Sequence, residues 1–163
     1  MRVLVAGVGN VLRADDGFGV AVVDRLEEGT VPDEVEIMDV GIGGIHLVQV
    51  LMEHVDGLVI ADALRMGRAP GTVLVLKPEV RDVTTLAPQE QRDELADMHY
   101  ATPERALMLA RGLSVLPDRT WLVGCEPVDV GSWSQGLTGP VAQAVDVAAD
   151  EVRRIVRALG VAW

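Results

Sequence analysis

Two aspartates and one histidine stand where the sequence can build a metal site. Asp16 follows the apolar run 3–8, Asp62 lies near the end of the run 57–63, and His99 precedes a helical pattern. Two carboxylates and an imidazole suit a divalent transition metal with open coordination positions. These ligand types do not distinguish nickel from zinc. The three residues predict a metal site if the fold brings them together.

The acids also have structural explanations. Asp15 and Asp16 are adjacent at the start of a predicted helix, where one acid caps the helix and the other complements its positive end. Capping is the favoured role for Asp15. Asp62 has the alternative of accepting hydrogen bonds from turn amides at the end of its strand. Because a cap does not require two acids, and His99 adds a third ligand, Asp16 and Asp62 are retained as site candidates.

The other histidines and the single cysteine fit structural roles better. His46 and His54 lie in one predicted helix, more than two turns apart, so they cannot chelate a metal jointly. His54 is predicted at the C-terminal end of that helix, where it can interact favourably with the helix dipole. For His46, contact with a substrate is the alternative to a structural role. Cys125 follows a strand pattern without a paired histidine, so we expect it to fill the core.

Strand-length apolar runs alternate with helical patterns, which is typical of an α/β fold. The expected architecture is a three-layer α/β/α sandwich around a mostly parallel five-stranded sheet. Strands are predicted at 3–8, 34–39, 57–63, 72–77 and 119–125, and helices at 16–29, 45–55, 102–113 and 139–159. The short connection after 57–63 predicts an antiparallel edge hairpin with 72–77. The acidic segment 79–98 is predicted to be an irregular surface loop.

The predicted strand order places the candidate ligands together. In a doubly wound sheet the first and third strands are neighbours, and their connections leave in opposite directions to open a crevice at the carboxyl ends. Asp16 and Asp62 are both expected to face it. The turn also opens with Gly7-Val8-Gly9, as in dinucleotide sites, but Leu12 replaces the third glycine and two acids would repel phosphates. A nucleotide-binding domain is therefore a less favoured alternative.

Length, charge and cysteine content limit the kinds of protein that this sequence can encode. The 163 residues fit one domain, 1–163, and no apolar run reaches the length of about 18 residues that a membrane span needs. The net charge of −11 argues against nucleic acid as a partner, because phosphates are bound by Lys and Arg. One cysteine excludes an internal disulfide and is compatible with a reducing compartment. A cytoplasmic protein is expected.

Motifs along nearly the whole chain resemble those of the hydrogenase maturation endopeptidases. Their order and spacing together are specific, whereas no single one is. They are Gly7-Val8-Gly9-Asn10, Asp15-Asp16-Gly17-Phe18-Gly19, Asp39-Val40-Gly41 with Gly44, Ile60-Ala61-Asp62-Ala63, His99, Leu122-Val123-Gly124-Cys125-Glu126-Pro127 and Gly136-Leu137-Thr138-Gly139-Pro140-Val141.

The resemblance implies a peptidase that removes the C-terminal extension of a nickel-loaded hydrogenase large-subunit precursor. It implies that Asp16, Asp62 and His99 bind the metal, with nickel supplied by the substrate, although zinc or another divalent transition metal suits the same ligands. The peptide bond is attacked either through metal polarisation or with a carboxylate, Asp16 or Asp39, as general base. A recognition module that binds the precursor without cutting it would use the same ligands.

A glycine-rich loop is expected to admit the substrate tail. It comprises Gly41, Ile42, Gly43 and Gly44. Ile42 replaces the threonine that is common in the family, Thr102 replaces a glycine, and Asp16 replaces the glutamate of some relatives. Aspartate at position 16 keeps the ligand chemistry, so the metal role is retained. The changes at Ile42 and Thr102 concern substrate contact or the shape of the histidine loop, and they bear on the identity of the large subunit more than on the reaction.

Overall fold

Five strands form one mixed sheet in the order β2-β1-β3-β5-β4. The computed structural model describes residues 1–95 and 103–163. The strands are β1 Val3–Val8, β2 Val35–Gly41, β3 Gly57–Ala63, β4 Val73–Leu76 and β5 Thr120–Cys125. The first four in this order run parallel, and β4 lies antiparallel at one edge. The carboxyl ends of β2, β1, β3 and β5 therefore share one edge of the sheet.

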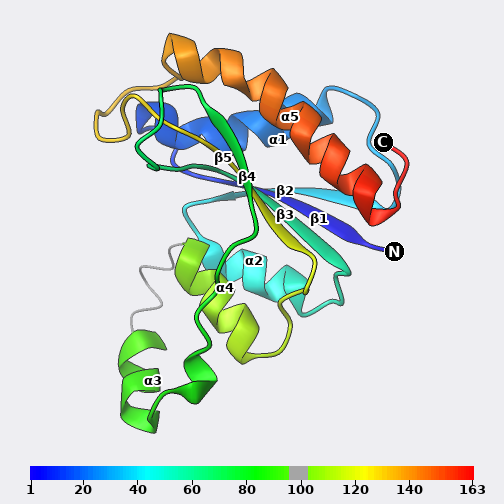
Figure 1. Ribbon diagram of the computed structural model, residues 1–163, viewed down its shortest axis with the longest axis vertical. Helices are drawn as coiled ribbons and strands as arrows, with labels where there is room; N and C mark the ends of the chain where they lie inside the picture. Colours follow the sequence, from blue (N-terminus) through cyan, green and yellow to red (C-terminus); the bar gives the residue numbers. More distant parts are fainter. Residues whose placement is uncertain (96–102) are drawn as a thin grey trace.

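Helices cover both faces of the sheet (Figure 1). The helices α1 Phe18–Glu27 and α5 Gly139–Leu159 pack on one face, and α2 Gly44–Leu51 and α4 Pro103–Gly112 pack on the other. All of β1 is buried because apolar side chains from both layers enclose it. The expected three-layer α/β/α sandwich with a mostly parallel sheet is thus confirmed.

The predicted antiparallel edge strand is confirmed, but its predicted pairing with 57–63 is wrong. The edge strand β4 pairs with β5, and β5 lies between β3 and β4. The connection crosses the end of β5, where the Leu64 amide donates to the Cys125 carbonyl at 2.9 Å and the Gly71 amide to the Glu126 carbonyl at 2.8 Å. Two strand spacings are only about 10 Å, so a connection short enough for a hairpin also reaches across one strand.

The segment predicted as an irregular loop contains two short helices. These are η2 Val83–Thr85 and α3 Pro88–Leu95, and α3 lies apart from the sheet (Figure 1). A proline at the first helical position and Glu90, which accepts from the Ala87 amide at 3.1 Å, support the start of α3. The acid-rich composition of segment 79–98 led to the prediction of a loop, although this signal for a helix start is present in the sequence. Residues 96–98 lie outside the described residues.

Two helix boundaries also differ from the expectation. A short 3-10 helix, η1 Ala14–Gly17, precedes α1, so Asp16 lies before the α-helix. The helix α2 ends at Leu51, and His54 follows with a positive φ of 61°. Among the described residues, no helix combines the length and the apolar character that a membrane crossing requires.

Candidate active site

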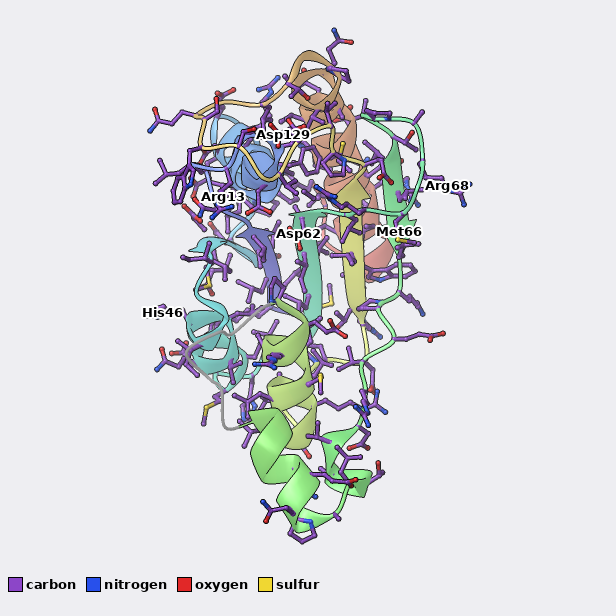
Figure 2. All side chains as sticks on the ribbon, turned by 90° about the vertical axis from the view of Figure 1, so that its left-hand side faces the viewer. Arg13, His46, Asp62, Met66, Arg68 and Asp129 are labelled. Atoms are coloured by element: carbon purple, nitrogen blue, oxygen red, sulfur yellow. The ribbon has the colours of Figure 1, made fainter. Side chains whose placement is uncertain are left out.

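Asp16 and Asp62 meet at the carboxyl edge of the sheet. The strands β1 and β3 are paired as far as Gly7 and Ala61, so Asp62 lies immediately beyond the last pair. Asp16 belongs to η1, which packs against β3, and its Oδ2 accepts from the Asn10 amide at 2.9 Å. Figure 2 shows Asp62 near the end of β3, between Arg13 on one side and Met66 on the other. The fold thus brings Asp16 and Asp62 to the same edge of the sheet, as predicted.

Two glycines allow η1 and α1 to approach the strands this closely. A Cβ atom at Gly19 would lie 2.1 Å from the Ala61 carbonyl oxygen, and one at Gly9 would lie 1.7 Å from the Asp16 carbonyl oxygen. Gly9 also has a φ of 135°, which L side chains rarely adopt. These glycines therefore serve backbone packing, and through it the position of Asp16.

The carboxyl of Asp62 has an unusual affinity for protons. Removal from water raises the pKa of Asp62 from 3.8 to about 7; a hydrogen bond from the Ala63 amide lowers it, and the charge of Asp16 raises it further. The carboxylate of Asp16 is therefore near enough for its charge to act on Asp62. A divalent cation beside Asp62 would offset this repulsion and favour the ionised form of Asp62.

Replacing Asp62 by asparagine is expected to stabilise the protein at alkaline pH when no metal is added. Because the pKa of Asp62 is about 7 in the folded protein and 3.8 ordinarily, stability falls as the pH rises through this window. The Asp62→Asn variant should lose this decline. The gain at pH 8 should be about 1–3 kcal/mol, discounted for the partial exposure of the side chain, with none below about pH 4.

Urea unfolding of wild type and Asp62→Asn at pH 4 and pH 8 measures this effect. Asp118→Asn is the matched control, because Asp118 is exposed at the opposite end of the sheet. Equal stability of Asp62→Asn and wild type at pH 8 would contradict the burial of a carboxylate at this position.

The third predicted ligand, His99, lies outside the described residues. Among the side chains that the structure describes, those of 1–91 and 103–163, no group of three from His, Cys, Asp or Glu is arranged to hold a metal. The described part of the site thus offers two carboxylates, Asp16 and Asp62, which fit two of the ligands in the predicted set. The metal site stays a prediction.

Asp39 and the glycine-rich loop lie on the neighbouring strand end. Asp39 is exposed, and its Oδ1 accepts from the Gly41 amide at 2.8 Å, which supports the positive φ of 55° at Gly41. Gly44 is buried at the start of α2, whereas the side chain of Ile42 is 72% exposed. β1 separates β2 from β3, so Asp39 stands farther along the sheet from Asp62 than Asp16 does. Its catalytic role stays a prediction.

The proposed capping role of Asp15 is wrong. Neither η1 nor α1 has a side-chain hydrogen bond at its N-cap. Asp15 is fully buried and accepts hydrogen bonds from the amides of Val128, Asp129 and Thr138 and from the Thr138 hydroxyl, at 2.7–3.0 Å. Burial raises the pKa of Asp15, but these hydrogen bonds outweigh it and hold the pKa below its ordinary value. Asp15 therefore fixes the loop that follows β5.

Glu126 plays a similar part that the sequence did not reveal. Its Oε2 accepts from the amides of Met66 and Arg68, at 2.7 and 3.0 Å, and the Arg68 hydrogen bond is the largest cause of its lowered pKa. Glu126 therefore fixes the loop that follows β3. It was visible only as part of the motif 122–127, which gave no indication of its partners.

Cys125 is fully buried in the core beneath α1 and α5. Burial is the largest cause that raises the pKa of its thiol to about 11, so the nucleophilic thiolate is disfavoured. The prediction that Cys125 fills the core is confirmed. His46 is exposed in the first turn of α2, and Figure 2 shows it on α2, away from Asp62.

A cavity of about 420 Å³ opens beside Asp62 on the α4 side of the sheet. Its walls are mainly aliphatic, with two further carboxylates. They comprise Ile60, Leu64, Pro78, Val80, Pro103, Leu107 and Leu122, together with Glu79 and Glu104. Such a cavity can hold a substrate side chain next to Asp62.

The fold and the paired acids define an α/β protein whose site lies at the carboxyl ends of parallel strands. The model of the hydrogenase maturation protease family HycI matches residues 20–155. The hydrogenase expression/formation protein HupD of Rhizobium leguminosarum bv. viciae is 35% identical over 162 residues, which cover 99% of this chain and 77% of HupD. The hydrogenase 2 maturation protease of Escherichia coli strain K12 is 35% identical over 164 residues, covering 99% of this chain and 94% of that protease.

The solved structure of the hydrogenase maturating endopeptidase HybD from E. coli has the same fold. The TM-score is 0.80 at 33% identity, with 99% of this chain and 96% of HybD covered. The chain belongs to the hydrogenase maturation protease family and is an endopeptidase.

Proposed function

We propose that this protein cleaves the C-terminal extension from the nickel-loaded large-subunit precursor of a nickel-iron hydrogenase. The observation that carries the proposal is the meeting of Asp16 and Asp62 at the strand ends, in a member of the maturation protease family. Two close carboxylates are poorly suited to an apolar peptide alone. They suit a peptide that arrives with a divalent cation.

In this proposal Asp16, Asp62 and His99 bind the nickel that the substrate carries. The cation supplies polarisation of the scissile carbonyl or of water. Binding of the cation favours the ionised form of Asp62, which releases its proton. The positive charge offsets the repulsion from Asp16 that raises the pKa of Asp62. Asp39, exposed on β2, or Asp16 takes the proton from the attacking water. A precursor without nickel lacks the ligand for this site and is left uncut.

The glycine-rich loop 41–44 and the aliphatic cavity beside Asp62 receive the peptide on the two sides of the acids. Ile42 contributes an exposed aliphatic contact at the β2 side. The proposal places this reaction in the cytoplasm, and the single cysteine, buried and without a disulfide, is compatible with that compartment.

The test compares nickel-loaded and nickel-free large-subunit precursor. Each is incubated with the purified protein, and the precursor mass is followed by mass spectrometry. We expect loss of a C-terminal fragment only from the nickel-loaded precursor, and no loss with the His99→Ala variant. Cleavage of the nickel-free precursor at an equal rate would refute nickel recognition. Binding without any change of mass would show a recognition module instead of a peptidase.

A further inference from the structure

We propose that six exposed apolar side chains around the site form a docking rim for the folded body of the hydrogenase large-subunit precursor. The docking rim consists of Val11, Leu12, Ile42, Met66, Val128 and Trp133. This inference rests on the proposed function, because it concerns how the same precursor is held. Ile42 also belongs to the loop proposed to receive the peptide, and the other five residues recognise the substrate beyond the peptide that is cut.

The exposed apolar side chains are concentrated at one edge of the molecule. Ten large hydrophobic side chains are exposed within 1–91 and 103–163, where side-chain exposure is described, and six of them form the docking rim. These six follow β1, β2, β3 and β5, whose parallel carboxyl ends share the edge that bears Asp16 and Asp62. The other four are Met1, Met52, Leu113 and Val147, in other parts of the fold. Scattered exposed apolar residues need no explanation, but a cluster around a site indicates a protein contact.

Trp133 is the most exposed member and is nevertheless held in place. Its side chain is 73% exposed, and the guanidinium of Arg13 lies 4.5 Å from the ring centroid. The Ala14 amide donates to the Ser134 carbonyl at 2.8 Å, and the Ser134 amide donates to the Leu12 carbonyl at 3.1 Å. The loops that carry Leu12 and Trp133 are thus joined. A fixed tryptophan stacked on an arginine loses little entropy on binding, and both residue types are frequent anchors of interfaces.

Two anchored acids hold the other loops of the docking rim. Asp15 accepts the Val128 amide at 2.8 Å, and Glu126 accepts the Met66 amide at 2.7 Å. Both acids are buried, which costs free energy that an ordinary surface loop would not require. The loops after β3 and β5 are therefore preorganised, with their apolar side chains turned outward.

The position of the docking rim favours a folded protein as its occupant. Its members come from the loops after four strands, from β2 at one side to β5 at the other, so the docking rim extends along the whole parallel part of this sheet edge. Figure 2 shows Arg13 and Met66 on opposite sides of Asp62. Any precursor that places its tail between Asp16 and Asp62 must bring its body against these loops. A second copy of this chain would instead cover the site.

The test measures cleavage of full-length nickel-loaded precursor by Trp133→Ser, Leu12→Ser and the control Val147→Ser. Val147 is 53% exposed on α5 and lies outside the docking rim. We expect KM to rise about tenfold or more for each docking-rim variant with kcat changed less than about twofold, and no change for the control. Thermal unfolding should be unaltered, because all three side chains are exposed.

The outcomes separate this proposal from the proposed function. If wild type cleaves the precursor and both docking-rim variants keep the wild-type KM, the docking rim is refuted and the peptidase function stands. If wild type cuts no nickel-loaded precursor, the proposed function fails. Sedimentation of wild type and Trp133→Ser adds a direct check: a wild-type dimer that Trp133→Ser separates, with KM unchanged, would assign the surface to self-association and overturn the proposal.

Discussion

Replacing Asp16 by alanine is expected to reduce precursor cleavage by about 100-fold or more, while the protein stays folded. Asp16 is one of two carboxylates that meet at the strand ends, so its loss removes a proposed ligand of the substrate nickel. In the metal-free protein the same change removes a negative charge that raises the pKa of Asp62. The change also removes the acceptor of the Asn10 amide, so these two effects on stability oppose each other. The variant should stay folded at pH 8 while it is nearly inactive.

Two further variants make the result specific. Asp16→Glu keeps the carboxylate and lengthens its reach by one methylene, so it should retain measurable cleavage. Asp24→Ala removes an exposed aspartate from α1 and should cleave at the wild-type rate. Single-turnover cleavage followed by mass spectrometry gives the rates, and urea unfolding gives the stabilities. Wild-type cleavage by Asp16→Ala would exclude this carboxylate from both metal binding and proton transfer.

The layers of the fold could be predicted because their signals are local. The valine-rich run of β1 and the first-turn proline and terminal glycine of α5 each specify their element without distant partners. The pairing of β4 was missed because connection length alone does not choose between β3 and β5. That choice depends on hydrogen bonds made at the end of β5, including those from Leu64 and Gly71. Such contacts are not encoded in any short window of sequence.

In the candidate site, too, one feature could be predicted from the sequence and another could not. The meeting of Asp16 and Asp62 could be predicted, because adjacent parallel strands end at the same edge of a sheet. The role of Asp15 could not, since its partners Val128 and Thr138 lie 113 and 123 residues away. Adjacent acids in the sequence therefore have unrelated tasks. Asp16 faces the site, and Asp15 turns inward to hold a loop.

Replacing Asp15 by alanine is expected to lower the free energy of unfolding by about 3–5 kcal/mol at pH 7. The change leaves three amides and one hydroxyl without their acceptor in a buried place. Asp15→Asn preserves the volume and one oxygen acceptor but loses the charge, so its loss should be smaller. The exposed Asp24→Ala should change stability by less than about 0.5 kcal/mol.

The dependence on pH has a defined sign. The pKa of Asp15 is lowered in the folded protein, so its contribution is present above its unfolded pKa of about 4 and is lost as the pH falls below that value. Urea unfolding should therefore show a gap between wild type and Asp15→Ala that is wide at pH 7 and narrows at pH 3. A variant as stable as wild type at pH 7 would contradict the anchoring role. Because the same loop carries Val128 and Trp133, Asp15→Asn should also raise KM for the full-length precursor, so that a residue without substrate contact weakens docking by releasing the loop that makes it.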